Sequence, residues 1–399
     1  MTTPPDVLDS ADPLASFRDR FVIDDDLVAY LDGNSLGRLP IATLDRLTAF
    51  VRDEWGGRLI RGWEEGWVDL PVTVGDELGA ALLGAAPGQT VVADSTSVCI
   101  FKLLHAAAGM RPGRDEIVID ATNFPTDRYL VESVAEARGL TIRWLEPDLV
   151  ENVTVAVLSE ALGDRTGVVL LSHVDYRSGT LLDLPVLTAA VHDAGAVVIW
   201  DVCHSAGVVP TALDAAGVDF AVGCTYKYVN AGPGAPAFVY VAARHLAEAR
   251  QPVAGWWSAA DLFAMGDVYE ASATIRRMLS GTPSVAGLLA VQEGVRLIAE
   301  AGIDAIRAKS EALTAYAIEL LDAAGLEIVT PRDAALRGSH VTVRHPDARA
   351  VTEKLVDRGV VPDFREPDLI RLGLSPLTTS YAELAAATRI LAEVAAPIG

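Results

Sequence analysis

The sequence has few of the residues that mark secreted, nucleic-acid-binding or membrane proteins. It contains three cysteines among 399 residues, Cys99, Cys203 and Cys224, and none of them forms a CxxC motif. An odd number of cysteines in apolar surroundings gives no disulfide framework and no metal site, so we expect three reduced thiols in the core. Basic residues are also scarce, because 32 lysines and arginines face 54 aspartates and glutamates and leave a net charge of −22. We therefore expect neither nucleic acid nor an anionic membrane as a partner.

Long apolar runs and targeting signals are missing as well. No uninterrupted run of about 18 apolar residues occurs, so no transmembrane helix is predicted. The first residues, MTTPPDVLDSADPL, are acidic and lack the basic and then apolar pattern of a signal peptide. We therefore expect a cytoplasmic protein. The sequence also contains no internal repeat and no flexible linker.

The overall pattern is that of a globular enzyme with more than one core. With 51% hydrophobic and 22% charged residues, a chain of 399 residues is too long for one simple core. Strands and helices alternate from about residue 90 to 240, which predicts an α/β fold with a mostly parallel sheet covered on both faces. Long helices at 284–325 and 377–396 alternate with short strands such as HVTVRH, which predicts a smaller α+β domain. Further predicted helices cover 41–55, ended by Gly56 and Gly57, then 72–86 and a segment from about Arg128.

Two residues near the middle of the chain suggest a cofactor. The apolar run from Val197 to Trp200 ends at Asp201, which is typical of a buried strand that carries a carboxylate to the ligand-binding edge of a sheet. Lys227 follows, between two tyrosines and ahead of a Gly-Pro-Gly turn. This pair suits pyridoxal phosphate, because a lysine amine forms a Schiff base with it and an aspartate keeps its pyridine nitrogen protonated. The alternative is a helix-capping aspartate and a solvated lysine.

Hydroxyl groups and an aromatic ring fit the same cofactor. The segment Asp94-Ser-Thr-Ser97 lies between a strand and a helix, where hydroxyls can cap the helix or hold a phosphate, and Thr96 and Ser97 are the favoured contacts. Phe124 stands at another strand-to-helix turn, where it can lie against a planar ring or simply fill the core. His173, next to a strand end, is interpreted as structural.

Three further residues are candidates for binding a substrate. Asn34 lies in the glycine-rich YLDGNSLGRLP, and Trp63 lies in RLIRGWEEGW, a segment suited to an aromatic ligand or equally to surface packing. Arg371 lies within the strand LIRLGLS, where a guanidinium suits a substrate carboxylate or a structural salt bridge.

Nearly the whole chain resembles the kynureninase family, in ordered blocks. The blocks are YLDGNSLGRLP, RLIRGW, DSTSV, NFPTDRY, LLSHVDYRSG, IWDVCHSAG, GCTYKYVNAGPGAPAFVYV and GWW. The family belongs to the pyridoxal-phosphate enzymes of fold type I, related to the class V aminotransferases. The resemblance implies a large domain with a mostly parallel seven-stranded sheet and a smaller α+β C-terminal domain. The expected division is an N-terminal segment at 1–45 that packs with the small domain, a cofactor-binding domain at 46–285 and the small domain at 286–399.

The resemblance also implies residue roles. Lys227 resembles the Schiff-base lysine, Asp201 the partner of the pyridine nitrogen, and Tyr226 a phosphate contact and proton relay. His204 is expected to support Asp201, and Arg371 to hold the substrate carboxylate beside Asn34 and Trp63. The implied cofactor contacts are Thr96, Ser97, Phe124, Asp127, Ser172, Asp201, His204, Tyr226, Lys227, Trp256 and Thr282. In this family Trp256 and Thr282 come from the second subunit, so a homodimer is expected.

The implied reaction is hydrolysis of L-kynurenine to anthranilate and L-alanine by Cβ–Cγ cleavage, a step of tryptophan degradation that can also serve NAD biosynthesis. Positions that depart from the family pattern lie on the substrate side, namely Cys99, Ser258, Ala259, Ala271 and Thr378. One alternative is therefore a related hydrolase of a biosynthetic pathway that acts on a modified kynurenine or another γ-carbonyl amino acid. A non-enzymatic scaffold is the other alternative, and a desulfurase is disfavoured because none of the cysteines has an activated setting.

Overall fold

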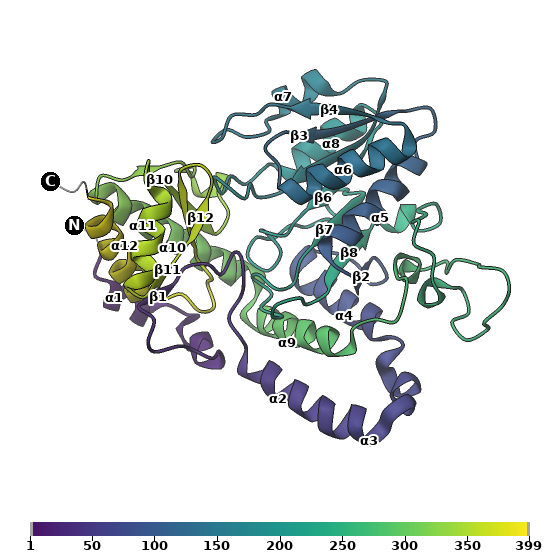
Figure 1. Ribbon diagram of the computed structural model, residues 1–399, viewed down its shortest axis with the longest axis horizontal. Coiled ribbons are helices and arrows are strands. Elements are labelled where there is room, and N and C mark those ends of the chain that lie inside the picture. Colours follow the sequence, from purple (N-terminus) through teal and green to yellow (C-terminus); the bar gives the residue numbers. More distant parts are fainter. Residues whose placement is uncertain (1–2, 397–399) are drawn as a thin grey trace.

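The larger of two main sheets organises the chain. The computed structural model describes residues 3–396 and contains a seven-stranded sheet of order β2-β8-β7-β6-β5-β3-β4 (Figure 1). β8 is antiparallel to both of its neighbours, β2 and β7, and the other pairs are parallel, so the predicted mostly parallel sheet is confirmed. The strands are β2 (Thr90–Ala93), β3 (Glu116–Asp120), β4 (Thr141–Leu145), β5 (Thr166–Ser172), β6 (Val197–Asp201), β7 (Phe220–Gly223) and β8 (Ala237–Val241).

Helices bury both faces of this sheet. On one face, Val91, Val197 and Ile199 pack with residues of α5 (Thr96–Gly109) and α6 (Pro125–Arg138). On the other face, Val198 and Trp200 pack with α4 (Leu70–Leu78), α7 (Val155–Ala161), α8 (Leu184–Asp193) and α9 (Val285–Ala301). Because successive strand residues point to opposite faces, β6 has to be apolar throughout, which explains the run that ends at Asp201.

A second sheet forms the smaller C-terminal domain. Its order is β12-β13-β10-β9, and every neighbouring pair is antiparallel. The strands are β9 (Glu327–Ile328), β10 (His340–Arg344), β12 (Asp363–Arg365) and β13 (Leu369–Gly373). The helices α10 (Ile303–Ala323), α11 (Ala348–Asp357) and α12 (Tyr381–Ala395) pack with it in a separate hydrophobic cluster, seen at the left of Figure 1. The predicted α+β domain is confirmed.

The N-terminal segment contacts mainly the small domain. α1 (Pro5–Ala11) lies against α12, and β1 (Ala29–Tyr30) pairs with β11 (Val360–Val361). Arg18 forms an ion pair with Glu383 at 2.6 Å, and Lys309 of α10 forms one with Asp12 at 2.6 Å. Leu14 and Phe21, however, pack with the large-domain core. These contacts agree with the expected division at 1–45, 46–285 and 286–399, which stays a prediction.

Several predicted helix limits differ from the structure. α2 (Ile41–Ala49) continues through a π-helical turn into α3 (Gly56–Arg58), so Gly56 and Gly57 do not end it. The predicted helix at 284–325 is broken at Gly302, whose φ of 80° no α-helix accommodates, and α10 begins at the next residue. α6 begins at Pro125 and not at Arg128, because proline is favoured in the first turn of a helix.

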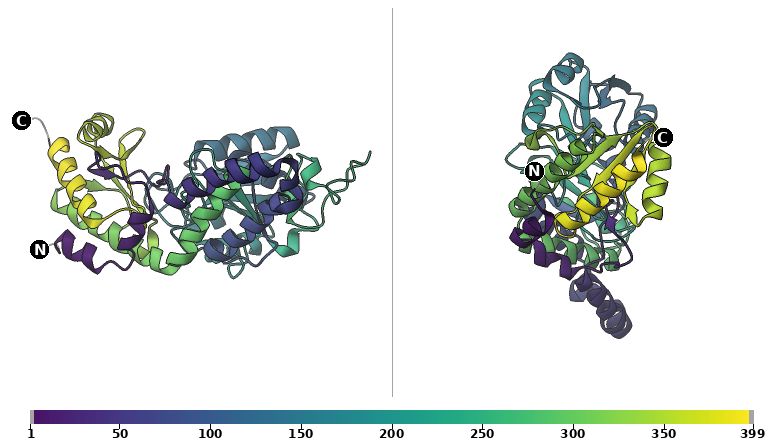
Figure 2. Two further views of the ribbon diagram at one scale, coloured as in Figure 1. Left: turned by 90° about the horizontal axis from the view of Figure 1, so that it is seen from below. Right: turned by 90° about the vertical axis from the view of Figure 1, so that its left-hand side faces the viewer.

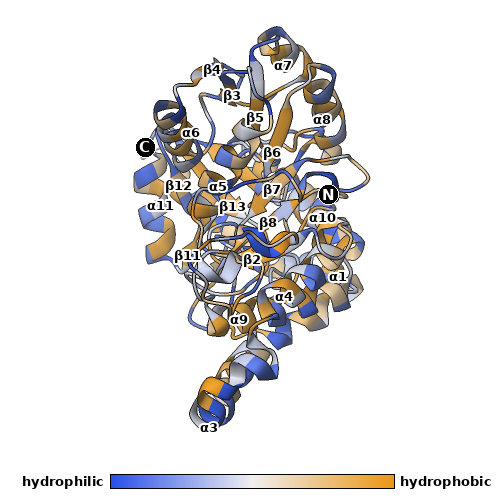
Figure 3. Cartoon of the chain, turned by 90° about the vertical axis from the view of Figure 1, so that its right-hand side faces the viewer, coloured by the Kyte–Doolittle hydropathy of each residue, from blue (hydrophilic) through white to orange (hydrophobic). Residues whose placement is uncertain are grey.

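Two segments project from the body of the molecule. The arm formed by α2, α3 and the turns up to Trp67 extends below the large domain in Figure 2, and α3 lies at its tip in Figure 3. Its outer residues include Trp55, Leu59 and Ile60, which are 59, 59 and 75% exposed. The other segment is the loop at 259–270, where Val268 is 86% exposed. Among residues 3–396, no helix combines the length and apolar character that crossing a membrane requires.

Candidate active site

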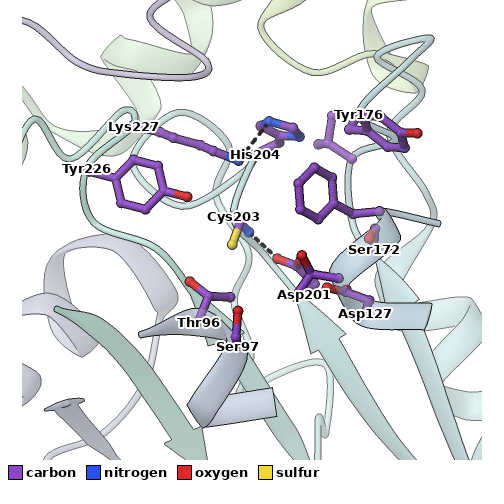
Figure 4. Close-up of a pocket in the computed structure, with 13 residues that line it drawn as sticks. Thr96, Ser97, Asp127, Ser172, Tyr176, Asp201, Cys203, His204, Tyr226 and Lys227 are labelled. Carbon is purple, nitrogen blue, oxygen red and sulfur yellow. Dashed lines mark hydrogen bonds between the residues drawn. The ribbon is translucent and has the colours of Figure 1, made fainter. Parts of the chain in front are cut away.

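A cavity of about 150 Å³ opens at the carboxyl ends of β5 and β6 and the N-terminus of α5 (Figure 4). This is the edge at which α/β folds bind ligands. The residues that line it are Thr96, Ser97, Phe124, Thr126, Asp127, Ser172, Val174, Tyr176, Asp201, Cys203, His204, Tyr226 and Lys227. The cavity therefore brings together nine of the residues that the sequence suggested, from five separate segments of the chain.

Lys227 enters this cavity from the loop that follows β7. Its Nζ lies 3.0 Å from Nε2 of His204, and the same ring nitrogen lies 3.1 Å from the carbonyl oxygen of Asn34. Burial, followed by the charge of Lys227, holds the pKa of His204 well below its usual range. His204 is thus a neutral ring beside the lysine amine. The expected support of Asp201 by His204 stays a prediction, and the contact with Lys227 is an additional one.

Two carboxyl groups lie next to each other at the end of β6. Asp201 accepts a hydrogen bond of 2.7 Å from the backbone N–H of Cys203. Asp127, in the first turn of α6, is buried, and its Oδ2 has no hydrogen-bond partner among residues 3–396. Burial and then the charge of Asp201 raise the pKa of Asp127 well above its usual range. Ionisation of Asp127 is therefore disfavoured beside Asp201.

The N-terminus of α5 offers free hydroxyl groups. Ser95 alone caps the helix, because its side chain accepts the N–H of Val98. Thr96 and Ser97 line the cavity, and Thr96 Oγ1 is buried without a partner among the described residues. A helix N-terminus with unused donors binds phosphate well. Tyr226 lies across the cavity from these hydroxyls in Figure 4, and burial followed by nearby Cys224 raises its phenol pKa, so the phenol is neutral.

The ring of Phe124 borders the same cavity. It is 38% exposed and packs edge-on against Tyr176, with ring centroids 5.3 Å apart. An aromatic side chain with one open face can stack on a planar ring. Ser172, at the end of β5, donates a hydrogen bond of 2.9 Å to Oδ1 of Asn123.

Five predicted site residues lie outside the cavity lining. Trp63 packs edge-on against Trp257 at 5.2 Å, and Trp256 packs against the same ring at 4.6 Å. Thr282 lines a separate pocket between β2 and the segment at 279–284. The other two are Asn34, which touches His204 through its backbone, and Arg371, which is fully buried.

Sequence reasoning did not single out some of the residues that line the cavity. Thr126, Val174 and Tyr176 were not proposed as site residues, and Cys203 was expected to be a plain core thiol. A signal for Tyr176 was present, because it follows β5 in a polar loop at the ligand-binding edge. Cys203 is buried, and hydrogen bonding with Cys224, then burial, raises its pKa, so it is not an activated thiol.

His173 provides a prediction about acid stability. Its ring is buried and packs edge-on against Trp200 at 5.8 Å, and burial, then Arg307, lowers its pKa to about 3. Between that value and the unfolded value of about 6.5, the unfolded chain binds more protons, so this residue lowers stability as the pH falls. The substitution His173→Gln removes this pH-dependent loss of stability. When the pH is lowered from 6.5 to 5, the unfolding free energy of the wild type should therefore fall by about 2 kcal/mol relative to that of the variant. Urea denaturation at both pH values measures it, and a constant difference would contradict it.

Known proteins were compared with this chain and its fold. A family model described as the kynureninase C-terminal domain matches residues 306–391. The kynureninase of Pseudomonas fluorescens is 43% identical, with 99% of this chain and 96% of that protein covered. The kynureninase of Deinococcus radiodurans is 42% identical, with 98% of this chain and 95% of that protein covered. Among solved structures, apo cysteine desulfurase from Thermococcus onnurineus NA1 has a TM-score of 0.82 at 18% identity, covering 95% of this chain and 97% of its own. The cystine C-S lyase C-DES has a TM-score of 0.83 at 20% identity, covering 92% of this chain and 98% of its own.

The seven-stranded sheet, the smaller C-terminal domain and these structural likenesses define the fold as fold type I of the pyridoxal-phosphate enzymes, as predicted. Relatives 43 and 42% identical over nearly the entire length then give the family within that class. The chain belongs to the kynureninase family.

Proposed function

We propose that this protein is a pyridoxal-phosphate-dependent hydrolase that converts L-kynurenine and water to anthranilate and L-alanine. The observation that carries the proposal is the position of Lys227, whose amine enters a cavity that also contains Asp201 and the hydroxyls of α5. The family membership supports the choice of substrate. We also propose a cytoplasmic location and a role in tryptophan degradation.

The residues of the cavity fit the cofactor at both of its ends. Thr96 Oγ1 is a buried hydroxyl without a partner at a helix N-terminus, which suits the phosphate group. Asp201, beside a carboxyl whose raised pKa favours its neutral form, suits a protonated pyridine nitrogen. When bound, pyridoxal phosphate supplies an aldehyde for the substrate amine and a ring that accepts an electron pair from the reacting carbon.

The residues of this chain would divide the remaining work. Lys227 removes the proton from Cα of the substrate, and the neutral His204 at 3.0 Å offers its nitrogen as a hydrogen-bond partner for the amine. Tyr226, held as a neutral phenol, donates a proton to the departing fragments. Phe124 orients the ring of the cofactor and Arg371 binds the substrate carboxylate. Asn34 and Trp63 are the proposed neighbours of the substrate.

A homodimer belongs to this proposal. Trp256 and Thr282 lie outside the cavity of their own chain, so they can serve a cofactor only in the cavity of another subunit. The projecting arm and the loop at 259–270 support such an assembly, since both carry exposed apolar side chains, among them Ile60 at 75% and Met265 at 69% exposure.

Turnover of L-kynurenine tests the proposal directly. The purified protein, incubated with pyridoxal phosphate and L-kynurenine, should release anthranilate, followed by its fluorescence, and an equal amount of L-alanine. D-kynurenine is the control, because a site that holds the α-carboxylate and the amine in fixed positions rejects the mirror image. Visible absorbance of bound cofactor without anthranilate release would contradict the substrate, and absence of that absorbance would contradict the enzyme.

A further inference from the structure

Arg371 already has a carboxylate partner in this structure. Its guanidinium is fully buried on β13 and forms an ion pair with Asp363, the residue opposite it on β12. Nη1 donates a hydrogen bond of 2.6 Å to the carbonyl of Tyr176, and Nη2 also donates to Ser35 Oγ at 3.1 Å. Tyr176 lines the cavity whereas Arg371 does not. A substrate carboxylate therefore meets a guanidinium whose two terminal nitrogens each already donate a hydrogen bond, whereas its Nε has no partner among the described residues.

Asp363 has a second cation within reach. Arg365, two residues along the same strand, places Nη2 at 2.9 Å from the same oxygen, Oδ2 of Asp363. The side chain of Arg365 is 34% exposed and that of Asp363 is 15% exposed, against 1% for Arg371. β12 is the edge strand of its sheet, so Asp363 lies where a side chain can turn outward without disturbing a neighbouring strand.

The acidic side chains around Arg371 disfavour the binding of another carboxylate. Asp32, a partly buried residue, also lies nearby: its Oδ1 is buried without a partner among residues 3–396, and Asp363 contributes to raising its pKa after burial. A bound substrate would add a third carboxylate to a site with two guanidinium groups. Like charges so close together repel strongly in a buried site, so one carboxylate has to leave. Asp363, the one with an outer partner, is the group able to do so.

We propose that Asp363 occupies Arg371 in place of substrate, and that binding of the α-carboxylate transfers Asp363 from Arg371 to Arg365. Asp363 and Arg365 are then positioning residues that set the affinity for amino-acid carboxylates. This inference rests on the proposed function only in taking Arg371 as the carboxylate-binding residue. No bond is made or broken, because the step exchanges one ion pair for another.

Two variants should change affinity in opposite directions. Asp363→Asn removes the competing carboxylate, so L-alanine should bind the cofactor-loaded enzyme about tenfold more tightly, as expected if Arg371 is occupied nine times in ten. Arg365→Gln removes the outer partner and holds Asp363 on Arg371, so L-alanine should bind more weakly. Thermal unfolding at increasing L-alanine concentration measures the dissociation constant without any turnover.

The controls separate this exchange from a general effect of charge. L-alaninamide has no carboxylate, so its binding should be unchanged in both variants. Asp368→Asn removes a charge near the same strands, where Asp368 pairs with Arg344 at 3.3 Å, and should leave L-alanine binding as it is. Weaker L-alanine binding in Asp363→Asn would mean that Asp363 only orients Arg371 and would overturn the proposal. Equal effects on L-alaninamide, or in Asp368→Asn, would overturn it too.

These measurements stay informative if the proposed reaction fails. L-alanine binding that tightens in Asp363→Asn, together with no anthranilate from L-kynurenine, would retain the exchange and reject the substrate. Should Asp363→Asn not fold, Arg365→Gln alone decides, because unchanged L-alanine binding in that variant contradicts the exchange.

Discussion

Lys227→Ala should abolish anthranilate release, lowering kcat/KM by more than about 10³-fold, since general acid–base catalysis alone contributes 10²–10⁴-fold. The variant loses both the amine that anchors the cofactor and the base that takes the substrate proton. The visible absorbance of the bound cofactor should change at the same time, because its covalent partner has gone. Rates of anthranilate release and absorbance spectra, recorded on the same preparations, measure both effects.

A matched lysine variant makes the comparison specific. Lys354 is exposed on α11, and Lys354→Ala should keep full activity and the wild-type spectrum. Thermal stability of Lys227→Ala should stay close to wild type, because the hydrogen bond that this side chain makes among the described residues is the one to His204. Residual activity within tenfold of wild type would reject Lys227 as the base.

The second large effect should come from Asp201→Asn, with a loss in kcat of about 10²–10⁴-fold. An amide cannot keep a pyridine nitrogen protonated, so the ring loses its ability to hold an electron pair. Asp127→Asn is the matched variant, because the raised pKa of Asp127 favours its neutral form and an amide resembles that form closely. We expect Asp127→Asn to lower kcat by at most about tenfold. Steady-state kinetics of both variants test this difference, and equal losses would show that the proton is not held by Asp127.

The sheet could be predicted from the sequence because its strands carry a strong local signal. The run from Val197 to Trp200 is apolar at every position and fully buried, as a central parallel strand requires. The ends of helices were less predictable. Gly56 and Gly57 resemble a helix stop, yet the helix continues, whereas Gly302 breaks a helix pattern that appeared continuous. A single glycine changes helix stability by only about 1 kcal/mol, so tertiary packing decides such cases.

The candidate site likewise has features that could be predicted from the sequence and features that could not. Asp201 lies at a strand end, Thr96 at a helix start and Lys227 in the loop after a strand, and such positions can be recognised from short motifs. The proton on Asp127 and the ion pair of Asp363 with Arg371 could not be predicted, since they depend on contacts between distant segments. Of the departures, Ser258 directly precedes the projecting loop and Ala259 begins it, and Ser258 Oγ is 3.0 Å from the hydroxyl of Tyr269, away from the cavity lining.

The position of β2 has a consequence for how the chain folds as it is synthesised. β2 is an edge strand, and among residues 3–396 its one neighbour in the sheet is β8, with Thr90 opposite Tyr240. At about 5–20 residues per second, a ribosome needs on the order of ten seconds or more to make the intervening chain. During that time Val91 and Val92, which are fully buried in the finished sheet, have no strand to pair with. The apolar edge formed by β2 therefore stays unpaired until β8, the last strand of the large domain, has left the ribosome.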